Sequence, residues 1–111
     1  LTLGDYAWVG DDAVLYTLGD ITIGANSVVS QKCYLCTGSH DFQSQHFDIT
    51  ATPIVIGEKC WLATDVFVAP GIEIGDGTIV GARSSVFKSL PANVICRGNP
   101  AVVIRERVET D

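Results

Sequence analysis

Aliphatic residues recur at every sixth position along most of this chain. The series comprises Leu3, Val9, Leu15, Ile23, Val29, Leu35, Ile56, Leu62, Val68, Ile74, Val80 and Val86. Glycine or alanine follows eight of these twelve residues. A period of six fits neither an amphipathic helix nor an alternating strand. It is typical of a parallel β-helix, in which three hexads close one triangular coil of 18 residues and further coils stack on it.

Each hexad predicts a short strand followed by a tight corner. The aliphatic residue should point into the coil, and the small residue after it should lie where the backbone turns, because glycine allows conformations that a Cβ forbids. Side chains eighteen positions apart should stack, so we expect Ile56 to lie over Ile74 and Leu62 over Val80. No coil can bury its apolar face alone, so burial of all twelve aliphatic residues should depend on stacking.

The repeat is interrupted twice. Between Leu15 and Ile23 the step is eight residues, which predicts a two-residue bulge near Gly19 and Asp20. After Leu35, residues 38–48 have no hexad phase, and the pattern resumes only at residues 54–56. We therefore expect one extruded loop at about 41–53. Since loops carry function more often than scaffolds do, this loop is the first place to look for a site.

The predicted fold class is all-β, a parallel β-helix of about five coils over residues 1–104 with a C-terminal tail at 105–111. The general rule for parallel crossovers predicts right-handed winding. After Val86 the repeat fades into turns, and the alternating segment 102–111 predicts a short helix or strand over the last coil. Because the chain starts within a repeat, we expect a short N-terminus whose first coil is uncapped.

Charge and hydropathy narrow the possible partners. The net charge of −6 argues against nonspecific nucleic-acid binding. The sequence contains no run of eighteen apolar residues, so it predicts no membrane span, and no signal-peptide pattern opens the chain. The last third of the chain holds five of the seven basic residues: Arg83, Lys88, Arg97, Arg105 and Arg107. These residues either bind an anionic ligand or form ordinary solvated surface charge.

The cysteines favour packing over metal or redox chemistry. Cys33 and Cys36 form a C-x-x-C, which is a weak signal without a second such pair or a histidine pair at ligand spacing. Cys33 and Cys60 occupy a repeat position that takes small residues such as Ala7, Ala13 and Ser27 elsewhere. We interpret them as small packing residues in a reducing cytoplasm, with no metal required.

Several segments resemble the hexapeptide-repeat acyltransferases. The blocks at 56–63, 69–77 and 98–101 recur in that family, and Leu35-Cys36-Thr37-Gly38-Ser39-His40-Asp41 looks like its colanic acid biosynthesis, galactoside and maltose acetyltransferase branch. The resemblance implies left-handed β-helices that assemble as a homotrimer, with acetyl-CoA as cosubstrate in a groove between subunits. It also implies O-acetyl transfer to a hydroxyl of a sugar or sugar-containing acceptor in polysaccharide biosynthesis.

Motif matching assigns the expected site. His40 is the expected general base, since a neutral imidazole can take the proton of an otherwise weak hydroxyl nucleophile. The developing oxyanion needs a backbone N–H donor, which family similarity puts at Ala63 and Thr64. The expected acetyl-CoA residues are Trp61, Ala63, Thr64, Gly81, Ala82, Lys88 and Arg105. Roles for Asp41, His46 and Arg83 stay open, and Phe87 stands where relatives often have a hydroxyl.

Two other interpretations remain. The mid-repeat start favours a noncatalytic β-helix, either a scaffold or an inactive remnant of such an enzyme. A γ-class carbonic anhydrase shares the fold, but its zinc needs three histidines and this chain has only His40 and His46.

Overall fold

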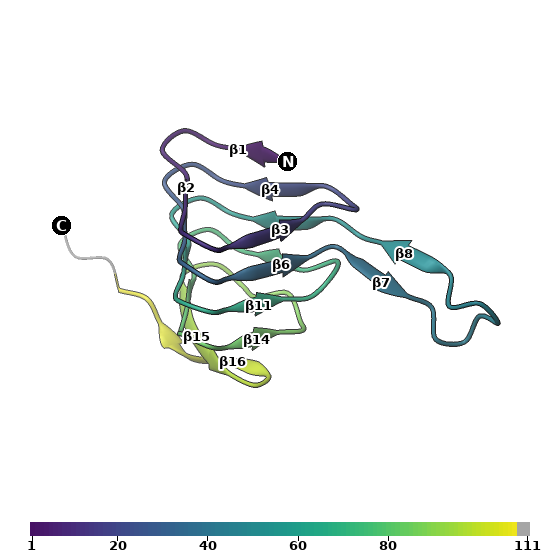
Figure 1. Ribbon diagram of the computed structural model, residues 1–111. Helices are drawn as coiled ribbons and strands as arrows, with labels where there is room; N and C mark the ends of the chain where they lie inside the picture. Colours follow the sequence, from purple (N-terminus) through teal and green to yellow (C-terminus); the bar gives the residue numbers. More distant parts are fainter. Residues whose placement is uncertain (109–111) are drawn as a thin grey trace.

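The sixfold repeat folds into strands of two or three residues separated by tight corners (Figure 1). The computed structural model describes residues 1–108. The strands stack into three sheets, here named A, B and C, which form the three sides of a coil (Figure 1). The predicted all-β, left-handed parallel β-helix is confirmed. The winding is the one that the family resemblance implied, and it departs from the general right-handed rule for parallel crossovers.

Each sheet collects one side of successive coils. Sheet A contains β1 (Thr2–Leu3), β4 (Ile21–Ile23), β9 (Ile54–Ile56) and β12 (Glu73–Ile74). Sheet B contains β2 (Trp8–Val9), β5 (Val28–Val29), β10 (Trp61–Leu62), β13 (Ile79–Val80), β15 (Val94–Gly98) and β16 (Ala101–Glu106). Sheet C contains β3 (Val14–Tyr16), β6 (Tyr34–Cys36), β11 (Phe67–Val68) and β14 (Ser85–Val86). Leu90 pairs with Ile74 and continues sheet A, so the described strands make four coils and part of a fifth.

The register confirms the stacking expected from the repeat. Ile56 lies beside Ile74 and Leu62 beside Val80, each pair eighteen positions apart. Thr2 instead pairs with Thr22, twenty positions away, which confirms two extra residues in the first coil. Because parallel strands pair one coil apart, the interior becomes a column of aliphatic side chains with no solvent exposure at Ile23, Val29, Leu35 and Leu62.

The first coil departs from the predicted burial. Leu3 remains 48% exposed, and Val9 and Leu15 are only half-buried. The other nine aliphatic residues of the repeat are buried. The prediction that all twelve are buried is wrong, because within residues 1–108 no further coil lies on the outer side of β1, β2 and β3.

The repeat glycines are required for a different reason from the one predicted. The positive φ angles at the corners belong to other residues, such as Asn26 (59°) and Asp65 (59°), and not to Gly24 or Gly57. A Cβ added at Gly24 would lie 2.6 Å from the backbone carbonyl carbon of Gly57 in the next coil. Close approach between coils, and not left-handed backbone, therefore explains the glycine that follows six of the twelve aliphatic residues.

The interruption after Leu35 forms a β-hairpin. β7 (Gly38–His40) and β8 (Ile49–Ala51) pair antiparallel and project away from the coil at the corner between sheets C and A (Figure 1). The extruded segment predicted at about 41–53 thus begins earlier, at Gly38, and its two arms are the strands β7 and β8. The alternating partners of a hairpin carry no sixfold signal, which is why the repeat ends there.

The C-terminal segment forms a strand, as one of the two expected alternatives. β16 pairs antiparallel with β15 and continues through residue 104, where the predicted β-helix domain ends. The Arg107 guanidinium donates to the carbonyl oxygens of Lys59 and Gly77, both at 3.0 Å, and so ties the chain across two coils. Arg107 is therefore engaged by the protein itself. The division at 104 stays a prediction, and its tail includes residues 109–111, which lie outside the described residues.

Three of the four cysteines are packing residues. Cys33, Cys60 and Cys96 lie inside the coil, and Cys33 and Cys60 donate to the carbonyl oxygens of Ala63 and Gly75 at 3.1 Å. Burial raises the pKa of each of these three thiols, which disfavours the reactive thiolate. Cys36 is only half-buried.

We expect native protein at pH 8 to react with a thiol-specific disulfide reagent at no more than one cysteine, Cys36. Denatured protein should react at all four. Absorbance of the released chromophore counts the thiols, and Cys36→Ser should abolish the native reaction. Rapid native reaction at two or more thiols would contradict the packing assignment.

In the part of the chain that the structure describes, no helix has the length and apolar character needed to cross a membrane.

Candidate functional site

His40 is the last residue of β7 and its side chain is exposed. Its Nδ1 lies 2.8 Å from the carbonyl oxygen of Phe47. A carbonyl oxygen only accepts hydrogen bonds, so Nδ1 carries the proton, and in the neutral ring Nε2 then keeps its lone pair. This geometry gives the imidazole a fixed orientation and a basic nitrogen that is free to accept a proton.

A shallow hollow of about 90 Å³ lies beside His40. It is lined by the hairpin residues Gly38, Ser39, His40 and Ile49 together with Tyr16 and Leu18 of the preceding coil. Apart from His40, the Ser39 hydroxyl and the Tyr16 hydroxyl, these side chains are apolar. The hollow can therefore receive one edge of a small molecule next to the imidazole.

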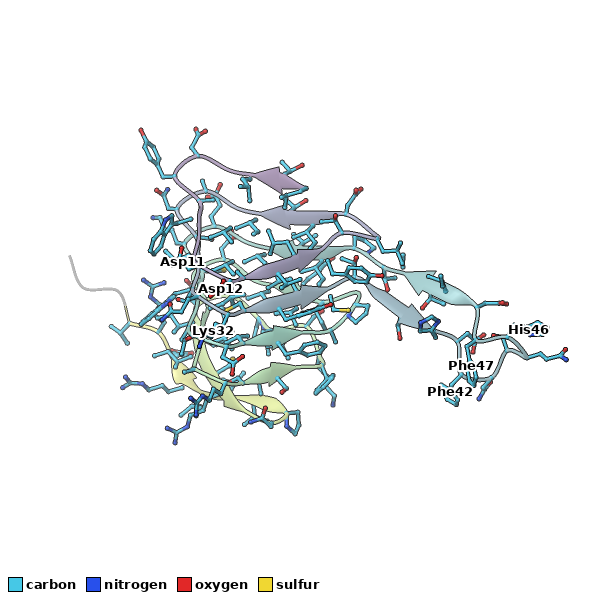
Figure 2. The ribbon with its side chains drawn as sticks, viewed as in Figure 1. Asp11, Asp12, Lys32, Phe42, His46 and Phe47 are labelled. Carbon is cyan, nitrogen blue, oxygen red and sulfur yellow. The ribbon has the colours of Figure 1, made fainter. Side chains whose placement is uncertain are left out.

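His46, whose role the sequence left open, lies away from that hollow. Together with Phe42 and Phe47, it lies at the far end of the hairpin (Figure 2). Asp41 is adjacent to His40 in sequence, but its Oδ1 accepts the backbone N–H of Gln43 at 2.9 Å. The contacts of Asp41 are thus local to the tip.

Trp61 lies on the outer face of sheet B. Its indole is 48% exposed, and its Nε1–H donates to the hydroxyl of Ser30 at 2.9 Å. Trp8 occupies the same column two coils away, since both pair with Val28. An exposed indole fixed by one hydrogen bond presents a flat apolar surface to a ligand or to another chain.

Ala63 and Thr64 form the corner between sheets B and C. The Ala63 N–H donates to the carbonyl oxygen of Val80 at 2.9 Å, so it is not available to an oxyanion. Of the two expected oxyanion donors, Ala63 is therefore disfavoured. Within residues 1–108, the Thr64 N–H has no hydrogen-bond acceptor. The Thr64 hydroxyl donates to Gln31 O at 3.1 Å. Thr64 therefore provides a free backbone donor at this corner.

Gly81 and Ala82 lie at the same corner in the next coil, eighteen positions after Ala63 and Thr64. Gly81 donates its N–H to Cys96 O, and a Cβ at Gly81 would lie 3.1 Å from the Cβ of Arg97, which gives this glycine a packing role. Among the described residues the Ala82 N–H has no acceptor, as at Thr64. Arg83, with a positive φ of 59°, turns the corner, and its N–H donates to Thr64 O.

Lys88 and Arg105 lie on different sides of the coil. Lys88 is exposed at the corner between sheets C and A, on the side from which the hairpin projects. Next to it, Phe87 packs on Phe67 with ring centroids 5.8 Å apart. Arg105 is exposed on β16, where it pairs with Ile95 at the end of sheet B.

The expected site residues therefore fall into two groups. The first, here called the groove group, lies on sheet B and the B–C corner and comprises Trp61, Ala63, Thr64, Gly81, Ala82 and Arg105. The second, here called the hairpin group, lies at the C–A corner and comprises His40 and Lys88. In a three-sided coil, the C–A corner is opposite sheet B (Figure 1). A single chain does not bring the two groups together.

Sequence reasoning missed a second hollow, of about 310 Å³, at the B–C corner in the first two coils. Its lining includes Trp8, Asp11, Asp12 and Lys32, on the side of the coil away from the hairpin tip (Figure 2). Trp8 precedes Val9 as Trp61 precedes Leu62, so the repeat position could have identified it. The Phe47 carbonyl was also missed, because backbone atoms leave no signal in sequence.

The described residues contain no group of three or more His, Cys, Asp or Glu side chains that could hold a metal ion.

Comparison with known proteins identifies relatives of the whole chain. Residues 53–88 match the family described as bacterial transferase hexapeptide (six repeats). The chain is 86% identical over all its 111 residues to an Escherichia coli (strain K12) protein, WcaF, whose name gives it as a candidate colanic acid biosynthesis acetyltransferase. The chain spans 61% of the length of that relative.

Solved structures share the fold. A maltose O-acetyltransferase from Clostridium difficile 630 has a TM-score of 0.92 and 30% identity, over 96% of this chain and 59% of its own. A hexapeptide-repeat acetyltransferase from Vibrio cholerae O1 biovar eltor, complexed with acetyl coenzyme A, has a TM-score of 0.91 and 26% identity, over 96% and 60% of the two chains.

Proposed function

The chain belongs to the hexapeptide-repeat acyltransferases, and from this premise we propose that the protein is an acetyl-CoA-dependent O-acetyltransferase. Its proposed acceptor is a hydroxyl of a sugar or sugar-containing molecule in polysaccharide biosynthesis. The names of its relatives support this class, since they include colanic acid biosynthesis and maltose acetyltransferases. We place the reaction in the cytoplasm, where free cysteines persist.

The observation that carries the proposal is the hydrogen bond that fixes the tautomer and orientation of the His40 imidazole. The hydrogen bond from Nδ1 to the Phe47 carbonyl leaves Nε2 free to remove the proton of the acceptor hydroxyl. The hollow lined by Tyr16, Leu18 and Ile49 holds the acceptor beside that nitrogen. The same imidazole, once protonated, returns the proton to the sulfur that leaves.

The groove group fits acetyl-CoA, whose thioester supplies an activated acetyl group. The unpaired N–H groups of Thr64 and Ala82 can donate to the carbonyl oxygens of the pantetheine arm or to the oxyanion that develops during transfer. Trp61 provides an apolar wall. Arg105 of the groove group, and Lys88 from the hairpin group of a neighbouring copy, are exposed cations suited to the phosphates.

We infer that each active site is shared by two copies in a homotrimer. Because the hairpin group lies opposite sheet B, His40 of one copy must reach the groove group of another. A closed ring of this kind joins two different surfaces of each subunit. Outward-facing Trp8, Val28, Trp61, Ile79 and Ile95 give sheet B an apolar stripe that supports such contact.

Two inactive variants should therefore restore activity when they assemble together. His40→Ala removes the base from every hairpin, and Trp61→Ala removes the groove wall, so each pure variant should be nearly inactive. In mixed trimers from equal amounts, about a quarter of the sites should pair an intact His40 with an intact Trp61, if mixing is random. Acetyl-CoA turnover with a panel of sugars, after unfolding and joint refolding, measures the recovery.

Separately refolded variants that are combined afterwards provide the control, because their subunits have not exchanged. No recovery in trimers shown to be mixed would refute sites shared between chains. Full activity of the pure Trp61→Ala protein would remove Trp61 from the proposed cosubstrate site.

A further inference from the structure

One peptide group in the hairpin is hydrogen-bonded at both of its polar ends. The carbonyl oxygen of Phe47 accepts from Nδ1 of His40 at 2.8 Å. The N–H of Asp48, in the same peptide group, donates to Oγ of Ser44 at 2.7 Å. Since a peptide group is planar and rigid, the imidazole and the hydroxyl hold opposite ends of one plane.

Ser44 is itself fixed within the tip. Its Oγ–H donates to the carbonyl oxygen of Asp41 at 3.0 Å, and its N–H lies 3.2 Å from that same oxygen. Asp41 in turn donates its N–H to Asp48 O at 2.8 Å, beside the strand pairing of the hairpin. Ser44 is half-buried, whereas the neighbouring tip residues are exposed. The hydroxyl is thus connected on both sides to backbone that the hairpin holds in place.

The backbone at Phe47 needs such support. Its φ is +50°, in the left-handed region that an aromatic residue rarely adopts. The Phe47 N–H donates to Ser44 O at 3.3 Å, a long bond that holds it weakly. Without the Ser44 hydroxyl, the Phe47–Asp48 peptide is free to rotate toward a more ordinary conformation. Rotation would turn the carbonyl away from His40 and remove the acceptor that keeps the proton on Nδ1.

We propose that Ser44 is a positioning residue that sets the tautomer and orientation of His40 through the Phe47–Asp48 peptide. The hydrogen bonds from Asp41 O to His40 form a chain in which each bond polarises the next. The catalytic consequence rests on the proposed function, since it requires His40 to act as the base. The effect on the tautomer does not.

The test compares Ser44→Ala with Ser44→Thr, which keeps a hydroxyl, and with Gln45→Ala as a matched change in the same tip. Long-range ¹H–¹⁵N spectra of protein labelled in histidine report which ring nitrogen carries the proton. We expect His40 to be Nδ1-protonated in the wild type, Ser44→Thr and Gln45→Ala, and to become a mixture of tautomers in Ser44→Ala. We also expect kcat to fall about 10- to 100-fold in Ser44→Ala alone, with KM for acetyl-CoA unchanged.

The two readouts separate failure of this inference from failure of the proposed function. If His40 stays Nδ1-protonated in Ser44→Ala, the positioning role is refuted, whatever the activity. If the tautomer changes while wild type and His40→Ala have equal activity, Ser44 still positions the imidazole and the proposed general base is wrong. A loss in Ser44→Thr equal to that in Ser44→Ala would also refute the role of the hydroxyl.

Discussion

Replacement of His40 by alanine should lower kcat about 10²- to 10⁴-fold, the range over which a general base contributes to proton transfer. The structure assigns a specific reason, since Nδ1 is engaged by the Phe47 carbonyl and Nε2 is free. The alanine variant should keep its fold, because the histidine side chain is exposed on the hairpin and outside the packed coil. Its KM for acetyl-CoA should change little, because the proposed contact of His40 is with the acceptor hydroxyl, whereas the groove group is proposed to bind the cosubstrate.

The measurement is acetyl-CoA turnover against a panel of mono- and disaccharides, with His46→Ala as the matched control. His46 lies at the far end of the tip, so its loss should leave turnover near that of the wild type (Figure 2). Equal activity in wild type and His40→Ala would remove His40 as the base. A well-folded protein that neither binds CoA in calorimetry nor turns over any acceptor would favour the noncatalytic scaffold.

Replacement of Leu62 by alanine should destabilise the fold by about 2–5 kcal/mol, as for large aliphatic residues in other protein cores. Leu62 has no solvent exposure and lies between Val29 in one neighbouring coil and Val80 in the other. Both coils would face the cavity, and a coil has little freedom to collapse because its backbone is bonded to the coils on each side. Stacking, and not local propensity, should dominate the loss.

Urea unfolding at a fixed protein concentration measures this effect, because the proposed assembly would make apparent stability depend on concentration. Leu3→Ala is the matched control, since Leu3 has the same repeat position in the exposed first coil. It should cost well below the Leu62 value, on the order of 1 kcal/mol or less. Similar losses at both positions would contradict the view that stacking on both sides stabilises the repeat.

The fold could be predicted from sequence because the signal is local and repeated. One aliphatic residue in six defines the inside of the coil, and the eighteen-residue offset between Trp61 and Ile79 follows from three hexads a coil. The hairpin was visible as a loss of phase from residue 38 onward, although its two strands were not. The glycine that follows six of the twelve aliphatic residues was visible too, but the predicted reason for it was wrong, because close approach between coils depends on atoms sixteen or more residues apart.

The candidate site could be predicted only in part. His40 and Trp61 stand out as departures from the repeat, but their separation on opposite sides of the coil follows from how three sheets close a triangle. The availability of the Thr64 N–H and the engagement of the Ala63 N–H depend on pairing with a neighbouring coil.

By itself, the sequence determined the β-helix, its register, the place of the hairpin and the family resemblance. These properties depend on which residue types recur at which spacing. A period in the sequence becomes a period in the structure because every coil packs on its neighbours in the same way. Only the tertiary structure decided which nitrogen of His40 is free, that Ser44 holds the Phe47–Asp48 peptide, and that one chain separates its hairpin group from its groove group. Those properties depend on backbone atoms and on contacts through space, which residue spacing does not encode.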